Sequence, residues 1–202
     1  EQAKALVARL PNGKGKIIRI YGAKTDNNAF QFKEGQDRVI LPLVEKGDIK
    51  GIHEDFTEDW KPENAKRITQ AAIAANGTDF DGILASNDGT AGGAIQVLTE
   101  EGLAGKIPVT GQDAELSACQ RIVAGTQAMT IYKPIRIVAQ NAAESAMKMA
   151  MGKPVIANSV VNNGKFDVPT MFLNVFVVTK ENMRETIIKD GYHTEEEVYR
   201  GV

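Results

Sequence analysis

Short apolar runs alternate with helical patterns along most of this 202-residue chain, and this alternation limits the possible folds more than any other feature. Four of the runs are typical of buried parallel strands, and Lys50–Phe56 is a weaker candidate. The four are Lys16–Tyr21, Gly82–Ser86, Ile107–Gly111 and Ala128–Tyr132. Strands that alternate with helices form a parallel sheet covered on both faces, so the sequence predicts an α/β fold.

Between these runs, apolar residues recur every three or four positions, as on the buried face of a helix. Such stripes run through residues 65–75, 91–98 and 138–149, and Pro62 suits a first helical turn. Glycines stand where helices should stop, at Gly77, Gly102, Gly125 and Gly152. Beyond Gly152 the rhythm changes, and we expect a strand at Phe172–Thr179 and a helix from Glu181 to about Lys189.

Composition and charge exclude several classes of function. The net charge is −2 and the basic residues are dispersed, so the chain has no electrostatic footprint for nucleic acid. No apolar run approaches the roughly 18–20 residues that cross a bilayer, and the opening EQAKALVARL is an amphipathic pattern rather than a signal peptide. Cys119 is the only cysteine, which excludes an intrachain disulfide and favours a small buried side chain on a helix.

The sequence carries none of the common catalytic motifs: no GxSxG, GxxxxGK[ST], GxGxxG or HExxH. Its two histidines, His53 and His193, are isolated from any cysteine, serine or partner at metal-ligand spacing. We therefore expect no catalytic residue, no metal site and no cofactor, and a protein that binds rather than catalyses.

Polar residues and the chain's one tryptophan follow the predicted strands at their carboxyl ends, where open parallel sheets bind their ligands. They are Asn27, Asn28, Trp60, Asn87, Asp113 and Lys133. Amides and carboxylates match the hydroxyls of a sugar, which donate and accept hydrogen bonds, and tryptophan offers a flat face to the ring carbons. An analogue without a matching hydroxyl leaves such groups unpaired, so the set favours a specific sugar site.

Each of these residues also has a purely structural interpretation. Asn87 and Asp113 could cap the helices that follow them, and one of the pair Asn27–Asn28 could start the helix that runs to Val44. Trp60 could belong to the core, and the default for any lysine, Lys133 included, is the solvated surface. The neighbouring Asp88 is better interpreted as a first-turn residue that favours the helix dipole than as a ligand contact.

Eight short stretches resemble the periplasmic pentose- and hexose-binding proteins of sugar ABC transporters, and the xylose-binding members most closely. They are TDNNA (25–29), DWKPENA (59–65), ASNDGTAGGAIQVL (85–98), GQDAEL (111–116), AGTQAMTIYKPI (124–135), NNG (162–164), DVP (167–169) and IKDGYH (188–193). They span nearly the whole chain in order, so the resemblance is specific and extends beyond the fold.

The resemblance implies the C-terminal lobe of a type I binding protein, with a Rossmann-like parallel sheet and helices on both faces. Residues 1–133 and 170–202 would build this sugar-binding lobe. Residues 134–169 would form a hinge crossing and the helix and strand that complete an N-terminal lobe missing from this sequence, so we expect a fragment of a longer protein. At the matching positions, sugar contacts are implied for Asn28, with Asn27 as an option, and for Trp60, Asn87, Asp113 and Lys133.

The resemblance also implies partners and a location. The ligand would be a monosaccharide, D-xylose first, delivered to the membrane subunits of an ABC permease. The alternative is a receptor that presents its closed state to a membrane sensor kinase; the effector domain of a sugar-responsive repressor is weakened by the lack of a basic segment. The location would be periplasmic or extracellular and membrane-associated, with a lipoprotein as one form.

The predicted helix at residues 138–149 would normally lie against the missing lobe. Its stripe consists of Val138, Ala142, Ala146 and Met149. Because large exposed apolar patches promote association, we expect a dimer or association with a second fragment.

Overall fold

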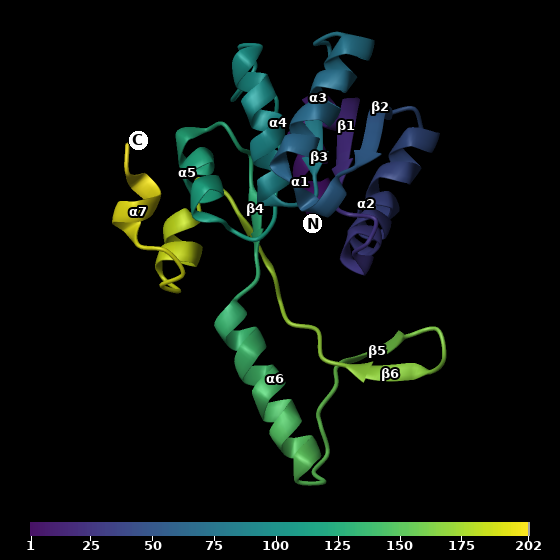
Figure 1. The fold of residues 1–202 in the computed structure, drawn as a ribbon, viewed down its shortest axis with the longest axis vertical. Coiled ribbons are helices and arrows are strands. Elements are labelled where there is room, and N and C mark those ends of the chain that lie inside the picture. Colours follow the sequence, from purple (N-terminus) through teal and green to yellow (C-terminus); the bar gives the residue numbers. More distant parts are fainter. Residues whose placement is uncertain (202) are drawn as a thin grey trace. The chain divides into compact units, whose positions relative to one another are not determined.

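The computed structural model describes residues 1–201, which divide into two compact units. The first unit comprises Glu1–Tyr132 and the segment from Val177 onward, and the second comprises Lys133–Phe176. Figure 1 labels the elements in chain order. The helices of the first unit are α1 (Gln2–Val7), α2 (Asn27–Glu45), α3 (Pro62–Asn76), α4 (Asp88–Glu100), α5 (Leu116–Ala124) and α7 (Glu195–Tyr199), with short turns η1 (Pro11–Gly13), η2 (Glu58–Trp60) and the π-helical η3 (Arg184–Ile188).

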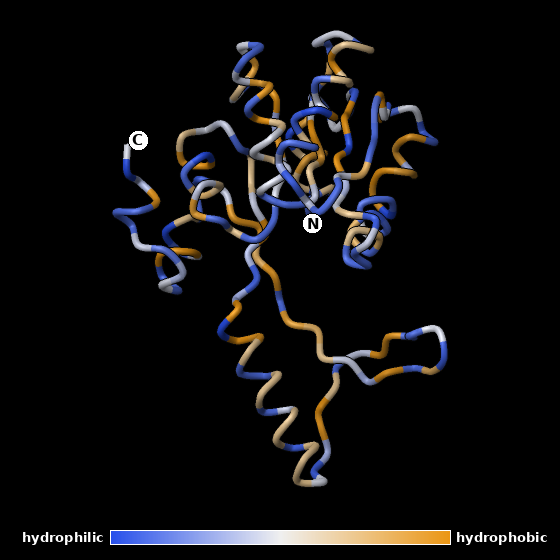
Figure 2. Tube along the Cα trace, viewed as in Figure 1, coloured by the Kyte–Doolittle hydropathy of each residue, from blue (hydrophilic) through white to orange (hydrophobic). Residues whose placement is uncertain are grey.

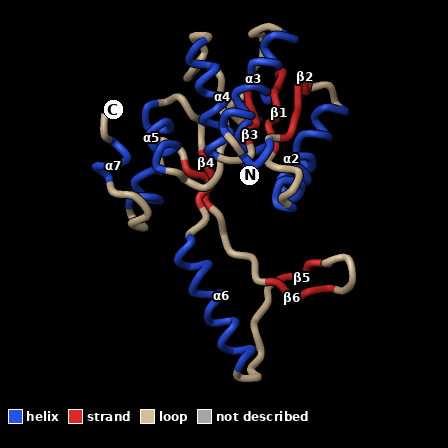
Figure 3. Tube along the Cα trace, viewed as in Figure 1, coloured by secondary structure: helices blue, strands red, loops and turns tan. Residues whose placement is uncertain are grey.

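A parallel sheet forms the centre of the first unit (Figure 3). Its strands are β1 (Gly15–Tyr21), β2 (Ile49–Phe56) and β3 (Gly82–Ala85), in the order β2–β1–β3. Tyr21 lies beside Phe56, and Ile20 lies beside Ala85, so all three strands end at the same edge of the sheet. The α/β prediction is therefore confirmed, and the weaker candidate strand at Lys50–Phe56 is a full member of the sheet.

The predicted strand at Ile107–Gly111 continues this sheet through single contacts rather than a regular ladder. Val109 forms a parallel bridge with Ile83, and the Thr110 N–H donates to the Ile83 carbonyl at 3.1 Å. On its other side, the Ala128 N–H donates to the Val109 carbonyl at 2.9 Å. Next along the chain comes β4 (Thr130–Tyr132), which pairs with β7 (Phe176–Val178).

The two faces of the sheet are buried under different helices. Successive side chains of a strand point to opposite faces, so β1 sends Ile18 and Ile20 into one apolar cluster and Ile17 into another. The first cluster contains residues of α3 and α4, and the second contains residues of α1 and α2. Gly93 lets α3 and α4 approach closely, because a Cβ there would lie 2.1 Å from the Pro62 carbonyl oxygen.

The helix boundaries follow the signals in the sequence. Pro62 is the first residue of α3, and Gly77 ends that helix with a φ of 73°. Gly125 ends α5 in the left-handed conformation with a φ of 85°. Cys119 is buried on α5 as expected, and burial raises the pKa of its thiol to about 12.

Two predictions near the C-terminus are wrong in their extent. The strand expected at Phe172–Thr179 is reduced to β7, because the Asn158 side chain accepts from the Phe172 N–H and donates to its carbonyl, both at 2.8 Å. The Phe172 backbone is thus satisfied without a strand partner. The helix expected from Glu181 to about Lys189 is only the five-residue π-helical turn η3.

The second unit consists of α6 (Ile135–Ala150) and an antiparallel hairpin of β5 (Ser159–Asn162) and β6 (Asp167–Thr170). The hairpin turn is stabilised by Asn162, whose side chain accepts from the Gly164 N–H at 2.8 Å. No residue of α6 is buried, and Figure 2 colours several stretches of the unit as hydrophobic. Val138 is 41% exposed and Met149 is 69% exposed, as the stripe predicted. In residues 1–201, no helix combines the length and apolarity needed to span a membrane.

Candidate functional site

Trp60 stands at the carboxyl end of β2, on a turn where both Asp59 and Trp60 have positive φ, 50° and 58°. Its indole N–H donates to the Asp26 carboxylate at 3.1 Å, and the Phe32 ring meets it edge-on at 6.1 Å. The ring covers Gly22, where a Cβ would lie 2.1 Å from two ring atoms. Trp60 is therefore half-buried and held in one orientation beside the end of β1, which contradicts its interpretation as a core residue.

Asp26 connects this ring to the start of α2. One carboxylate oxygen holds Trp60, and the other accepts from the Asn28 N–H at 2.8 Å as the N-cap of the helix. Asn27 is the first residue of α2, so the prediction that one of the pair Asn27–Asn28 starts this helix is confirmed, while the capping side chain is that of Asp26. Both asparagines are exposed, which leaves their amides accessible to a ligand.

Asn87 caps α4, as its structural interpretation predicted. Its side-chain oxygen accepts from the Thr90 N–H at 2.9 Å, in a reciprocal capping box with the Thr90 hydroxyl. The cap engages the oxygen of the amide and fixes the plane of the group. The amide NH₂ of Asn87 is thereby held in a defined direction, so capping and ligand binding are compatible roles.

Asp113 does not cap a helix, so that alternative is wrong. The helix α5 begins at Leu116 with Glu115 as its N-cap. Asp113 and Ala114 instead form a turn with φ of 101° and 53°, values that residues other than glycine seldom adopt. The Asp113 N–H donates to the Ile131 carbonyl at 2.9 Å, and the side chain is half-buried.

Asp88 has a larger role than the predicted interaction with the helix dipole. It is in the first turn of α4, but its side chain has no exposed surface. One oxygen accepts from the Glu115 N–H at 3.0 Å and the Thr130 hydroxyl at 2.8 Å, and the other accepts from the Gln127 amide at 2.8 Å. Burial raises the pKa of Asp88 to about 7, although these three donors act to lower it. The buried Asp88 carboxylate therefore connects the loop of Asn87, which precedes it in sequence, to the loop of Asp113.

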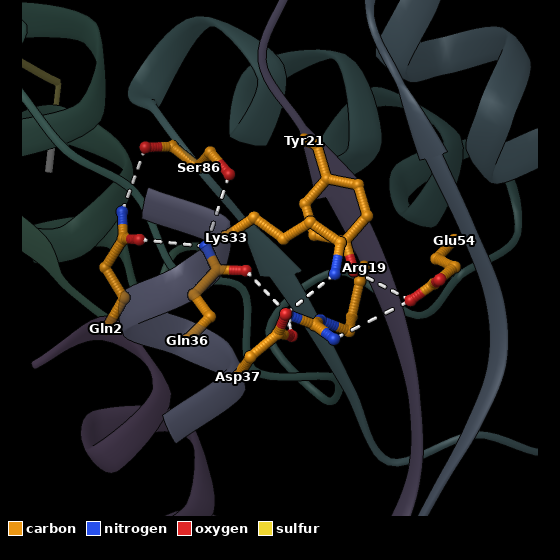
Figure 4. A network of polar contacts seen from close by, with 8 residues as sticks. All are labelled: Gln2, Arg19, Tyr21, Lys33, Gln36, Asp37, Glu54 and Ser86. Carbon is orange, nitrogen blue, oxygen red and sulfur yellow. Dashed lines mark hydrogen bonds and ion pairs between the residues drawn. The ribbon is translucent and has the colours of Figure 1, made fainter. Parts of the chain in front are cut away.

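A second polar network lies beneath the same edge of the sheet (Figure 4). The Gln2 amide donates to the carbonyls of Ser86 and Gly111, at 3.0 and 3.1 Å. The Gln36 amide donates to the Gln2 side-chain oxygen and the Ser86 hydroxyl, both at 3.2 Å. These bonds attach α1 and α2 to the strand ends that precede Asn87 and Asp113.

The same network continues to Arg19, which the apolar run at Lys16–Tyr21 concealed. Arg19 is 3% exposed, and its guanidinium lies 2.6 Å from Asp37 and 3.6 Å from Glu54 (Figure 4). It stacks on the Tyr21 ring at 4.9 Å, and its Nε is the one buried side-chain polar atom of residues 1–201 without a hydrogen-bond partner. A buried arginine requires carboxylate partners of this kind. In the sequence, Asp37 on α2 was the residue that could have indicated a buried Arg19.

Lys133 directly follows β4, as predicted, but it is the first residue of the second unit. Its side chain is half-buried. Its part in the site therefore stays a prediction.

The remaining candidates follow adjacent strands of one parallel sheet. Asn28 follows β1, Trp60 follows β2 and Asn87 follows β3. Asp113 follows the segment that bridges to β3 at Val109. Since these strands run parallel and end in register, the amides, the carboxylate and the aromatic ring stand along one edge. Such a row can hydrogen-bond hydroxyls and cover an apolar ring face.

Other features of the described chain point to no second centre of chemistry. A cavity of about 340 Å³ lies between β2 and α3, and its lining includes His53, Asp55, Phe56 and Arg67 but none of the predicted site residues. No group of three or more His, Cys, Asp or Glu side chains in residues 1–201 is placed to hold a metal ion.

Comparison with known proteins defines the class. Residues 1–154 match the model of the periplasmic binding protein domain, and the chain belongs to this family. It is 46% identical over 197 residues to the D-xylose-binding periplasmic protein of Escherichia coli (strain K12), covering 98% of this chain and 59% of that protein. It is 44% identical over 198 residues to the D-xylose-binding periplasmic protein of Haemophilus influenzae, with the same coverage of each.

The solved structures give the same class. A carbohydrate transporter solute-binding protein from Chloroflexus aurantiacus, in complex with D-glucose, aligns with a TM-score of 0.85 at 31% identity, over 97% of this chain and 65% of that one. These relatives are named for binding or transporting sugars, in agreement with the expectation of a binding protein rather than an enzyme. The chain spans less than two thirds of the length of each.

Proposed function

We propose that this chain is part of a periplasmic receptor that binds a monosaccharide, D-xylose first among the candidates, and delivers it to an ABC-type permease. One observation carries the proposal: Asn28, Trp60, Asn87 and Asp113 follow adjacent strands at one edge of the sheet. D-xylose is put first because the relative from E. coli is named for that sugar and is 46% identical over nearly the whole chain.

Each residue has a role that its chemistry supports. The Trp60 ring, held by Asp26, covers the C–H face of the pyranose. The Asp113 carboxylate accepts from two neighbouring hydroxyls, and such charged acceptors make the stronger bonds. The Asn87 amide donates from its capped, fixed position. Asn27, Asn28 and Lys133 complete the polar contacts at the margins.

We further propose a division of labour between the two units. Residues 1–133 and 170–202 form the sugar-binding lobe, and residues 134–169 belong to a second lobe whose remainder lies outside this chain. The support is that α6 has no buried residue and that the chain spans 59% of the two xylose-binding relatives. Only a closed state would let the sugar contact both lobes at once, so the sugar would drive closure of the two lobes. The names of the same relatives support a periplasmic location, and a lipid anchor would hold the receptor at the membrane.

The test is calorimetric titration of the intact gene product with D-xylose, D-glucose, D-arabinose and xylitol. We expect D-xylose to bind most tightly and xylitol, which has no pyranose ring, to bind weakly. Tightest binding of D-glucose would retain the sugar receptor and overturn the choice of xylose. No binding of any sugar would overturn the proposed function.

A further inference from the structure

The turn that carries Asp113 has an unusual backbone. Asp113 and Ala114 are consecutive residues other than glycine with positive φ, 101° and 53°. Such conformations cost free energy and persist only where the neighbouring structure holds them in place. The contacts of this turn therefore determine where the Asp113 carboxylate points.

Three groups hold the N–H groups of the turn from below. The Asp113 N–H donates to the Ile131 carbonyl at 2.9 Å. The Ala114 N–H donates to the Thr130 hydroxyl at 3.1 Å, and the Glu115 N–H donates to the Asp88 carboxylate at 3.0 Å. All three donors of the turn are thus satisfied by β4 and α4.

The C-terminal segment holds the carbonyls of the turn from a distance of 79 residues in sequence. His193 Nε2 lies 2.8 Å from the Ala114 carbonyl oxygen, and it must donate because a carbonyl only accepts. The Tyr192 hydroxyl donates to the Asp113 carbonyl at a longer 3.5 Å. The Tyr192 ring packs on the rings of Tyr132 and His193, with centroids 4.9 and 4.7 Å away.

We propose that Tyr192 and His193 are positioning residues, which clamp the Asp113–Ala114 turn in its left-handed conformation and so aim the Asp113 carboxylate at the sugar. Without the His193 donor, the bond from the Glu115 N–H to Asp88 is the main remaining restraint on the Ala114–Glu115 peptide, so this peptide can rotate and the turn can relax to negative φ. That rotation would carry the carboxylate away from its position. The inference rests on the proposed function, because it assigns these residues to the same sugar site.

The experiment compares matched variants of the full-length protein by calorimetry with D-xylose. His193→Gln keeps an amide donor in reach of Ala114, whereas His193→Ala removes it. We expect affinity to fall about tenfold for His193→Ala and less than about threefold for His193→Gln, as for loss and retention of one hydrogen bond. Tyr192→Phe should have the smaller effect because its bond is long. Glu195→Ala, an exposed residue whose carboxylate contacts Arg184, is the control and should leave affinity unchanged.

A double-mutant cycle separates positioning from general stability. In an Asp113→Asn background, His193→Ala should weaken binding by much less than tenfold, because the carboxylate it aims is already gone. An equal loss in both backgrounds would mean that His193 only stabilises the fold, and would overturn the inference.

Hydrogen exchange tests the clamp independently of sugar binding, because it is measured on the sugar-free protein. The amides of Ala114 and Glu115 should exchange faster in His193→Ala and regain their protection in His193→Gln. Unchanged exchange in His193→Ala would overturn the clamp whatever the sugar affinity. If the wild type bound no sugar, the proposed function would fail, and exchange alone would decide the clamp.

Discussion

The two halves of the candidate site rest on different kinds of support, although both stand at one edge of one sheet. We call Asn87 and Asp113 the Asp88 half, because the loops of both residues are tied to that fully buried carboxylate. We call Asn28 and Trp60 the Asp26 half, because the half-buried Asp26 carboxylate holds both.

Burial makes the two supports unequal. A lost bond in the Asp88 half leaves a buried group unsatisfied, whereas water can replace a lost bond in the Asp26 half at little cost. We therefore expect the Asp88 half to be rigid and the Asp26 half to adjust when a ligand binds.

The largest expected effect is on the Asp88 half. Asp88→Ala should lower the free energy of unfolding by about 3 kcal/mol, because three buried donors lose their acceptor. Urea unfolding measures this. The control is Glu63→Ala, which removes an exposed first-turn carboxylate from α3 and should change stability by less than about 0.5 kcal/mol. Equal effects would mean that Asp88 acts only through the helix dipole.

Sugar affinity should separate the two halves next. Asp113→Ala should cost about 1.5–3 kcal/mol in the full-length protein, roughly 10- to 150-fold, since a charged acceptor is lost. Trp60→Ala should cost about 1 kcal/mol for every sugar tested, because a ring face recognises all pyranoses alike. Calorimetry with D-xylose and D-glucose checks both. Unchanged affinity in both variants would place the sugar site elsewhere.

A smaller effect is expected on the helix behind the Asp26 half. Asp37→Ala should lower the free energy of unfolding by about 1.5 kcal/mol, less than the full cost of breaking a buried pair, because Glu54 still lies 3.6 Å from Arg19. Thermal unfolding of Asp37→Ala and of the double variant Arg19→Met/Asp37→Leu, which removes both charges, tests this explanation. The double variant should be the more stable of the two. A loss as large as that of Asp88→Ala would abolish the contrast between the halves.

Whether a contact is local or distant in sequence also explains which features could be predicted from the sequence. Apolar runs indicated the strands β1, β2 and β3, and the spacing of apolar residues indicated the helices α3 and α4, because both patterns lie within a single element. The rule that ligands bind at carboxyl ends selected Trp60, Asn87 and Asp113 for the same reason. The part played by Asp88 could not be predicted, since its partners Gln127 and Thr130 are about 40 residues away.

Other misses share that cause. His193 looked isolated because its partner, Ala114, is 79 residues away and offers only a backbone carbonyl. Arg19 looked like part of an apolar strand, and its charge is accommodated only when Asp37 packs across from α2. A pattern within one element cannot show which distant group will satisfy a buried polar atom.

The smallest expected effect is the pH dependence of stability. The folded pKa of Asp88, about 7, is raised above its ordinary 3.8, mainly by burial. Between these values the folded protein keeps a proton that the unfolded chain has released, so stability falls as pH rises and levels off above the folded pKa. From pH 6 to 7 the fall due to this group should be about 1 kcal/mol. Urea unfolding at several pH values should show this slope in the wild type and lose it in Asp88→Asn. An equal slope in both would assign the titration to another group, and the Asp88 half would then be held by a permanently charged carboxylate.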